Sequence, residues 1–352
     1  MNILILGASY GSLLSTKLLM AGHNVSLVCL PEEAQLINQS GTEVRLKLKG
    51  ASEHQSIFSA SLPGDLDAVI PAKVDLARYD LVGLAMQEPQ FAAKEVGELV
   101  SRVAKAGLPC LSIMNMPPLA YLRRIPELTA MNLDRCYLDA AVWADFDPDN
   151  ITLCSPDPQA FRPPEEPLNV LHVGLPTNFK AARFEKPEHQ RILQQLCDDI
   201  AAVRLDNKET PVKLKVHDSL FVPMAKWSML MTGNYRCIAS DNIRAIKDAV
   251  HSDKTASADV YAFVDQLVQK IGGNAADAVP FEKYANAAES LLKPSSAARA
   301  IDAGAPNIER VDRLVQTIGR EIGLQHPSVD STVAIVDARL EANRKSRALE
   351  QA

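Results

Sequence analysis

The sequence lacks several features that mark particular classes of protein. No apolar run reaches the roughly 18 residues that a membrane span needs, and Met1 and Asn2 lead directly into an apolar segment, without a basic start or a cleavage site. No run of Lys or Arg is present, and the formal net charge of −6 argues against a nucleic-acid-binding surface. We therefore expect a cytoplasmic protein that binds no nucleic acid and no membrane.

Paired cysteines are also missing. The six cysteines form no Cys-x-x-Cys motif, and Cys29 and Cys110 lie in apolar segments that are typical of buried strands. This pattern predicts free thiols in a reducing compartment, with neither a disulfide framework nor a metal site. The length of 352 residues exceeds one ordinary hydrophobic core and predicts two domains, while 47% hydrophobic and 23% charged residues are typical of a globular protein.

The first thirty residues predict a strand, a glycine turn, a helix and a second strand. Residues 1–7 form an apolar run that ends in Gly7, residues 13–21 have apolar side chains at helical spacing, and residues 25–30 form a second apolar run. In such a βαβ unit, glycine allows the backbone to approach a pyrophosphate, and the helix N-terminus stabilises its charge.

The turn differs from the Gly-x-Gly-x-x-Gly pattern of dinucleotide-binding proteins. Gly7 fits the first glycine, Ser9 stands at the second, and the third is either Gly11, one residue early, or Ser12 at the standard spacing. Because the turn follows the first strand and opens the first helix, we expect a dinucleotide site there; the alternative is a βαβ unit that binds nothing. The expected cofactor-binding residues of the turn are Gly7, Ala8, Ser9, Tyr10, Gly11 and Ser12.

The end of the second strand usually discriminates NAD from NADP. An acidic residue there binds the ribose 2′-hydroxyl, whereas an arginine accommodates a 2′-phosphate. Here the position holds Leu30, followed by Pro31, and no nearby basic residue is evident. Glu32 or Glu33 could reach the ribose, or both could be solvated carboxylates at the start of a helix that runs to about Ser40.

The next segments continue the alternation of strands and helices that predicts a parallel sheet. We expect a half-exposed strand at 44–48, a helix at 91–106, a helix at 187–203 and buried strands at 80–86 and 109–114. Gln87 and Asn115 follow the two buried strands, so they are candidates to contact cofactor or substrate; the alternative is that both amides only cap turns. Residues 136–186 predict further strands, with a proline-rich hairpin connection between Ile151 and Leu171.

Helical patterns dominate after His217. They occupy about 218–240, 254–271, 283–292, 306–322 and 328–348. The sequence therefore predicts a Rossmann-like, doubly wound α/β domain at residues 1–212 and an all-helical domain at 213–352 for substrate binding and dimerisation. Lys226, Leu230 and Asn234 are four residues apart and share one face of the first helix, which indicates a polar pocket or, alternatively, a snorkelling lysine and a surface asparagine.

Several segments together resemble one family, the ketopantoate reductases (2-dehydropantoate 2-reductases), which are NADPH-dependent 2-oxoacid reductases. The resemblance runs from Met1 to about Glu341. The similar segments are the glycine turn with Gly22-His23-Asn24-Val25, Met114-Asn115-Met116 at the position of a Gln-Asn-Gly motif, and residues 303–309 at the position of a segment ending in Thr-Glu-Ile-Asp. The family's C-terminal domain is helical and similar to that of 6-phosphogluconate dehydrogenase.

The resemblance implies roles for particular residues. Lys226 falls on the catalytic lysine, Asn234 on the second asparagine of a Lys-x-x-x-Asn-x-x-x-Asn pattern, and Ser295 on a substrate-contacting serine. Asn115 takes the position of an asparagine that bridges cofactor and substrate. Asn307, at the position of a functional glutamate, would hold a hydroxyl or carbonyl of the substrate.

The departures from the family concern the same sites. Leu230 replaces the first asparagine of the helix, Asn307 replaces the functional glutamate with Glu309 on the aspartate two residues later, and Leu30 replaces the 2′-phosphate arginine. We therefore expect the family's fold with a changed substrate, and not an authentic ketopantoate reductase. NADPH is favoured by the resemblance, while Leu30 leaves NADH open.

The expected function is reduction of the carbonyl of a small 2-oxoacid to a 2-hydroxy acid by an NAD(P)-dependent oxidoreductase of the EC 1.1.1 type, as a homodimer. One alternative is an opine-type dehydrogenase, in which His217 beside Asp218 would be the acid/base; otherwise that pair is a helix N-cap next to a surface histidine. Another alternative is a non-catalytic dinucleotide-binding protein that senses redox state.

Overall fold

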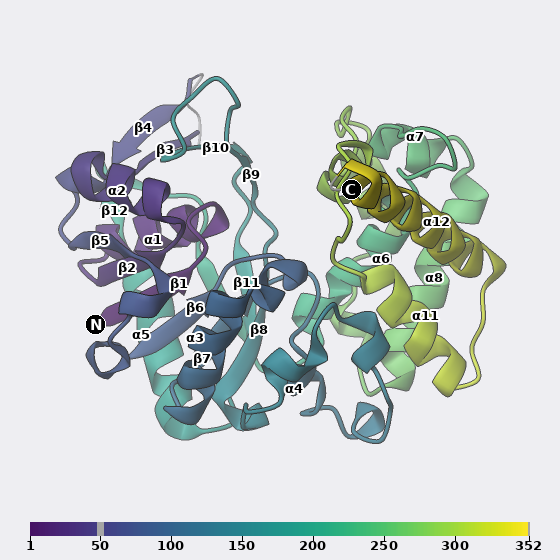
Figure 1. Ribbon diagram of the computed structural model, residues 1–352, viewed down its shortest axis with the longest axis horizontal. Coiled ribbons are helices and arrows are strands. Elements are labelled where there is room, and N and C mark those ends of the chain that lie inside the picture. Colours follow the sequence, from purple (N-terminus) through teal and green to yellow (C-terminus); the bar gives the residue numbers. More distant parts are fainter. Residues whose placement is uncertain (48–52, 351–352) are drawn as a thin grey trace. The chain divides into compact units, whose positions relative to one another are not determined.

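Eight strands form a mainly parallel sheet in the N-terminal part of the chain (Figure 1). The computed structural model describes residues 1–47 and 53–350. The strand order is β14-β11-β8-β7-β6-β1-β2-β5, and every neighbouring pair is parallel except β8 and β11. The strands are β1 (Asn2–Leu6), β2 (Asn24–Val28), β5 (Leu66–Val69), β6 (Leu81–Leu84), β7 (Cys110–Ile113), β8 (Ile151–Ser155), β11 (Phe179–Ala182) and β14 (Leu214–His217).

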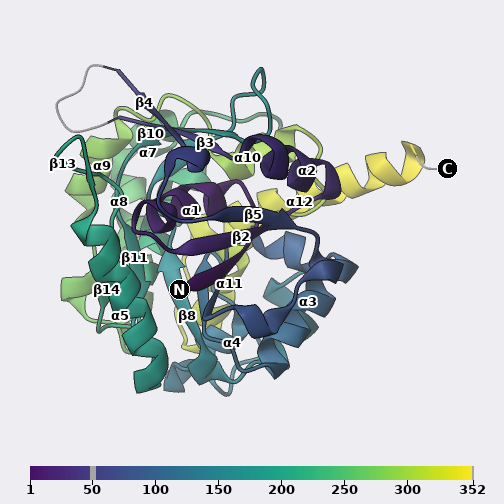
Figure 2. The same ribbon diagram turned by 90° about the vertical axis from the view of Figure 1, so that its left-hand side faces the viewer.

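Helices cover this sheet on both faces. Helix α1 (Tyr10–Met20) contacts α5 (Pro187–Ala202), and Figure 2 shows α5 and α3 (Lys94–Lys105) on opposite sides of the sheet. Helix α2 (Pro31–Ser40) packs against β5. Every residue of β6 and β7 is buried, because a parallel sheet between two helical layers exposes neither face. The predicted doubly wound fold is therefore confirmed.

A second, four-stranded sheet in the same part of the chain was not predicted. Its order is β4-β3-β10-β9, with β3 (Glu43–Leu46), β4 (Gln55–Phe58), β9 (Gln159–Phe161) and β10 (Val170–Leu175). The strand expected at 44–48 is β3, although Leu48 lies outside the described residues. The proline-rich hairpin lies within this second sheet, since β10 pairs with β9, while β8 pairs with β7 and β11 in the first sheet.

The C-terminal part of the chain is helical. Beyond β14, the described residues contain one isolated bridge, Ile238 to Ile243, and no further strand. This confirms the predicted helical region. Its helices are α6 (Lys226–Met229), α7 (Ile246–His251), α8 (Lys254–Lys270), α9 (Phe281–Ala288), α10 (Ser296–Asp302), α11 (Val311–Glu321) and α12 (Pro327–Glu350).

The long helix expected at 218–240 is wrong. The chain forms a 3-10 turn at Val222–Ala225, the single turn α6, and a π-helix at Leu230–Asn234. Pro223 lies in the 3-10 turn, consistent with its missing N–H donor. In the π-helix the Tyr235 N–H donates to the Leu230 carbonyl at 2.9 Å, which is the wider i to i+5 spacing.

Contacts divide the chain into two units. Unit 1 contains Met1–Met86, Gln90–Tyr121 and Ala141–Pro223, and unit 2 contains Gln87–Pro89, Leu122–Ala140 and Met224–Ala352. The boundary predicted between residues 212 and 213 precedes β14, which belongs to the sheet of unit 1 through its pairing with β11. In the described part of the chain, no helix combines the length and apolar character of a membrane span.

Candidate functional site

The glycine turn of unit 1 contains two glycines, and each is required for a different structural reason. Gly7 has φ +100°, and a Cβ there would lie 2.6 Å from the Ala85 carbonyl oxygen, at the end of β6. A Cβ on Gly11 would lie 2.7 Å from Ile5 Cγ2, so its absence lets α1 pack closely on β1. In dinucleotide-binding turns the third glycine has this packing role. Gly11 therefore takes it, one residue earlier than in the usual pattern.

The side chains of the turn are partly engaged. The Ser12 hydroxyl donates to the Ala8 carbonyl, and the Tyr10 hydroxyl donates to the carbonyl of Pro158, just before β9. Ser9 is exposed at the N-cap of α1, and its side chain makes no capping bond. The first turn of α1 carries no acidic residue. The Ser12 N–H donates to the Ser9 carbonyl at 3.1 Å, and a helix N-terminus without acidic side chains is compatible with an anion.

At the end of β2 the two candidate glutamates differ. Leu30 and Glu32 are exposed, whereas Glu33 is buried and its Oε1 accepts from Nη2 of Arg162. Arg162 follows β9 and lies 129 residues further along the chain. No basic residue is evident near this strand end in the sequence, and the structure brings one there from a distant segment.

Gln87 and Asn115 follow neighbouring strands. β6 pairs with both β1 and β7, so the carboxyl ends of these three strands lie along one edge of the sheet. Asn115 is half-buried and belongs to unit 1 with the glycine turn, while Gln87 belongs to unit 2. Their roles as cofactor or substrate contacts remain predictions.

Lys226 begins α6 and is half-buried, while Leu230 is buried at the start of the π-helix. Tyr284 holds this irregular region, since its hydroxyl donates to the Met229 carbonyl at 3.1 Å. A Cβ on Gly233 would lie 2.0 Å from that hydroxyl, which explains why glycine stands there. Single π-turns inside helices occur frequently at functional sites.

The Ser295 side chain contacts the backbone of Asn234. The Ser295 hydroxyl donates to the Asn234 carbonyl at 2.7 Å and accepts from the Ala298 N–H at 3.1 Å, as the N-cap of α10. Ser295 is buried, and these two bonds give it a structural role. Its hydroxyl fixes the C-terminal end of the π-helix.

The segment that carries Asn307 and Glu309 is held from two sides. The Tyr235 hydroxyl donates to the Glu309 carbonyl at 2.6 Å and accepts from the Val311 N–H at 3.0 Å. Asn307 Oδ1 accepts from Nη2 of Arg344 at 3.1 Å. The segment is therefore held by Tyr235, the residue directly after the π-helix, and by Arg344 of α12.

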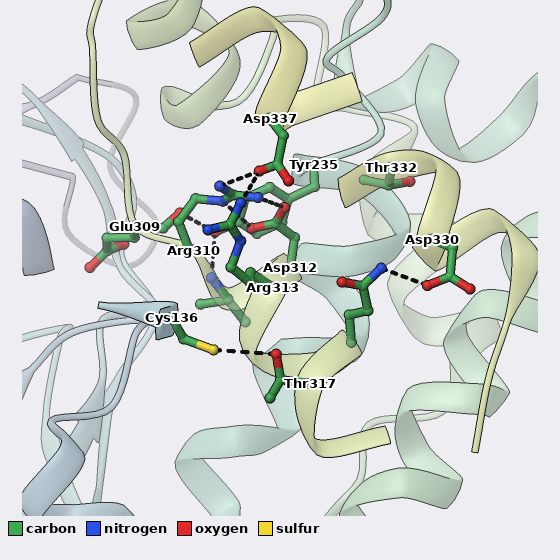
Figure 3. Close-up of polar contacts among 12 residues, drawn as sticks. Cys136, Tyr235, Glu309, Arg310, Asp312, Arg313, Thr317, Asp330, Thr332 and Asp337 are labelled. Atoms are coloured by element: carbon green, nitrogen blue, oxygen red, sulfur yellow. Dashed lines mark hydrogen bonds and ion pairs between the residues drawn. The ribbon is translucent and has the colours of Figure 1, made fainter. Parts of the chain in front are cut away.

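A buried ion-pair cluster anchors the next residues (Figure 3). Arg310 donates to both carboxylate oxygens of Asp312 at 2.9 Å and pairs with Asp337 of α12 at 2.7 Å. Asp312 is fully buried, and Asp337 also binds Arg313. Figure 3 shows the Glu309 side chain pointing away from this cluster. Arg310 thus secures the backbone, while the Glu309 carboxylate is directed elsewhere.

Glu88 is a second carboxyl group in unit 2 that sequence reasoning missed. It is 2% exposed, its Oε1 accepts from the Leu138 N–H at 2.9 Å, and its own N–H points to Glu309 Oε1 at 3.4 Å. Burial raises the pKa of Glu88 to about 7, and the charge of Glu309 contributes to this rise. Glu88 directly follows Gln87, beyond the end of β6, and this position in the sequence could have identified it as a candidate site residue.

The His217–Asp218 pair is not at a helix start. His217 is the last residue of β14 and pairs with Ala182 in the sheet, and the Asp218 carbonyl accepts from Nε of Arg183 at 3.2 Å. The alternative of an N-cap aspartate is therefore wrong. All six cysteines are free, and among the described residues no group of three or more His, Cys, Asp or Glu side chains is placed to hold a metal.

Comparison with known proteins finds similarity in solved structures. No family model and no curated protein matches the sequence. D-mandelate dehydrogenase in its ternary complex with NADH and anilino(oxo)acetate is 16% identical, with a TM-score of 0.67 over 98% of this chain and 100% of that chain. A ketopantoate reductase from Ralstonia eutropha JMP134 is also 16% identical, with a TM-score of 0.66 and the same coverage.

A third structure is the dimeric ketopantoate reductase from Staphylococcus aureus, which is 10% identical, with a TM-score of 0.64 over 97% of this chain and 100% of that chain. At these identities the similarity establishes the fold over nearly the whole length of the chain. It agrees with the Rossmann-like sheet and the helical C-terminal region described above.

Proposed function

We propose that this chain is an NAD(P)H-dependent oxidoreductase that reduces the carbonyl of a small 2-oxoacid to the hydroxyl of a 2-hydroxy acid. The observation that carries the proposal is the glycine turn between β1 and α1, in a chain whose fold matches oxidoreductases over nearly its whole length. One of those structures holds NADH together with an oxoacid derivative.

The residues of the turn fit a dinucleotide. Gly7 has the left-handed backbone that the tight turn needs, Gly11 brings α1 close to β1, and the first turn of α1 has no acidic side chain. The N–H groups at the start of α1 would bind the pyrophosphate, with the helix dipole favouring its negative charge. Gln87 and Asn115, at the ends of β6 and β7, would contact the cofactor further along the same edge of the sheet.

When bound, the reduced nicotinamide supplies the hydride that the carbonyl carbon receives. Lys226 would place its ammonium beside the carbonyl oxygen, stabilise the alkoxide that develops there, and donate the proton from Nζ. The buried Leu230, one turn further on, would keep water away from this group and so strengthen the interaction between charges.

The other predicted substrate residues would act in two ways. The side chains of Asn115 and Asn234 would orient the substrate by hydrogen bonds. Ser295 and Asn307 already bind Asn234 and Arg344, so their contribution would be to hold the loops in place, with Asn307 reaching a substrate hydroxyl or carbonyl if it leaves Arg344. Because Asn307 is neutral, Glu309, two residues later, is the carboxylate that would favour a substrate with a hydrogen-bond donor.

A panel of 2-oxoacids tests the proposal, each assayed with NADH and with NADPH by the loss of reduced-nicotinamide absorbance. Amino acids are added in parallel reactions. Reduction of a 2-oxoacid alone supports the proposal, whereas a requirement for an amino acid would identify an opine-type dehydrogenase. Cofactor binding in calorimetry without turnover of any compound would identify a non-catalytic sensor.

We also propose a homodimer that forms through the helical region. The support is the dimeric ketopantoate reductase of similar fold and the prevalence of closed two-fold dimers. Light scattering at micromolar concentration should report about twice the chain mass. A monomer at that concentration would contradict the dimer but not the reductase.

A further inference from the structure

An arginine from a distant segment lies at the position that discriminates NAD from NADP. Arg162 directly follows β9, and its Nη2 donates to Oε1 of Glu33 in the first turn of α2. The Glu33 side chain is 9% exposed and the Arg162 side chain 23% exposed. The carboxylate is therefore the buried member of the pair, and the guanidinium is the member that a ligand would meet.

The pair lies close to the end of β2. Burial raises the pKa of Cys29, the residue after β2, to about 12; the charge of Glu33 raises it further and that of Arg162 acts in the opposite direction. Glu33 lies in the first turn of α2, four residues after Cys29, and Arg162 is bonded to it, so both groups lie near this strand end. The Gly7 N–H donates to the Val28 carbonyl at 2.9 Å, which places the glycine turn beside the same strand end. In this fold class, the adenine ribose binds at the end of the second strand.

The segment before Arg162 is fixed relative to the turn. The Tyr10 hydroxyl of the turn donates to the Pro158 carbonyl, and β9, which follows, pairs with β10 in the second sheet. β10 in turn pairs with β3, which follows α2 along the chain. The segment that leads to Arg162 is therefore attached to the turn through Pro158, and Arg162 itself is bonded to Glu33.

We infer that Arg162 binds the 2′-phosphate of NADPH and that Glu33 positions its guanidinium for this contact. The inference rests on the proposed function. An arginine has five N–H donors in a planar fork that matches phosphate geometry. Among the described residues, the Arg162 side chain bonds to Glu33 through Nη2, so its other guanidinium N–H groups remain for a phosphate. Arg162 thus supplies what Leu30 lacks.

The competing assignment is that Glu33 accepts a hydrogen bond from the ribose 2′-hydroxyl, which would favour NADH. Against it, Glu33 is buried and already bound to a cation, while the guanidinium is the more exposed partner. A phosphate approaching this pair meets the positive group first. The two assignments predict opposite cofactor preferences and are separated by substitutions at the two residues.

Calorimetric titration with NADPH and NADH tests the inference without any substrate. Wild type should bind NADPH more tightly, and Arg162→Ala should lower the ratio of the two affinities by about 10- to 100-fold, the scale of one charge-assisted contact. Arg162→Lys should restore part of the ratio, because it keeps the charge but loses the fork. Adenosine 2′,5′-bisphosphate and adenosine 5′-monophosphate serve as probes that carry or lack the same phosphate.

The matched control is Arg204→Ala, which removes another arginine of unit 1 that pairs with a glutamate, Glu209, at 3.7 Å. Its affinity ratio should equal that of wild type. Glu33→Gln should weaken NADPH less than Arg162→Ala does, and it should leave NADH unchanged. Loss of NADH affinity in Glu33→Gln, or an unchanged ratio in Arg162→Ala, would overturn the inference while leaving the reductase proposal intact. Failure of wild type to bind either cofactor would overturn both.

Discussion

Lys17 lies inside unit 1 and makes the stability of the protein depend on pH. Its side chain is 1% exposed in α1, and Nζ donates to the Thr210 hydroxyl and, at 3.0 Å, to the Pro211 carbonyl. Burial, aided by the charge of Lys213, lowers the pKa of Lys17 to about 7. No acidic partner offsets its charge among the contacts of the described residues, so the folded state disfavours the protonated form.

The sign of the pH dependence follows from this shift. Between about pH 7 and the ordinary lysine pKa of 10.5, the unfolded chain holds a proton on Lys17 that the folded chain has released. Stability therefore rises with pH in this window, by roughly 1.4 kcal/mol per pH unit, and the contribution is flat below pH 7. Lys17→Met should remove this slope. Its lost hydrogen bonds shift stability at every pH and do not affect the slope.

Denaturant unfolding at several pH values from 6 to 9 measures the effect. The free energy of unfolding of wild type minus that of Lys17→Met should grow by roughly 2 kcal/mol between pH 7.5 and 9. Lys105→Met is the control, since Lys105 is 68% exposed in an ion pair with Asp145, and its difference from wild type should stay constant. A constant difference for Lys17→Met as well would refute the reasoning.

Three further outcomes are expected. Glu88→Gln keeps an oxygen for the Leu138 N–H but cannot ionise. Because the raised pKa of Glu88 makes wild type lose stability as pH rises from about 4.5 to 7, the free energy of unfolding of the variant should gain roughly 1–3 kcal/mol relative to wild type by pH 7.5. Denaturant unfolding measures this gain, and no gain would contradict burial of the charge. Asp312→Asn should lower the free energy of unfolding by about 3 kcal/mol, because it removes one of the two carboxylates that pair with the buried Arg310. Asp330→Asn, at a partly exposed ion pair, should lower it by less than about 1 kcal/mol. Equal losses would contradict the larger contribution of the buried ion-pair cluster. Gly11→Ala should cost about 1–3 kcal/mol by pressing on Ile5 and should weaken dinucleotide binding in calorimetry; unchanged affinity would separate the turn from the cofactor.

The fold of the first domain could be predicted because its strands are short apolar runs bounded by turn residues. β1 and β6 are buried on both faces, so their sequences are continuous apolar runs, and such runs are typical of a parallel sheet. The second sheet escaped prediction because β3 and β10 are 124 or more residues apart along the chain, and β9 has three residues. Pairing over such distances leaves no local pattern.

The helix carrying Lys226 shows where periodicity misleads. Its apolar spacing is helical throughout, but Gly233 admits the Tyr284 hydroxyl, and the turn widens into a π-helix. The bond from that hydroxyl to the Met229 carbonyl joins residues 55 positions apart and could not be predicted. For the same reason, the position of Arg162 could not be predicted, because its partner Glu33 precedes it by 129 residues.

The candidate site was predicted in part. The position of the glycine turn follows from the βαβ pattern, and Gly11 as its packing glycine was one of two options that the spacing left open. The structural bonds of Ser295 and Asn307 depend on tertiary packing with Asn234 and Arg344, so sequence spacing could not distinguish them from substrate contacts. Their roles, and that of Lys226, stay predictions.

Single-turnover transfer of deuterium tests the central proposal most directly. The reduced cofactor carries the label on the transferring position of the nicotinamide, and the product of an accepted 2-oxoacid is analysed by mass spectrometry. We expect one deuterium at C2 of the 2-hydroxy acid, and a transfer rate in Lys226→Ala that is roughly 10²- to 10⁴-fold lower with cofactor affinity little changed. Absence of label in the product for every 2-oxoacid, although the cofactor binds, would contradict the reductase; an undiminished rate in Lys226→Ala would contradict its catalytic role.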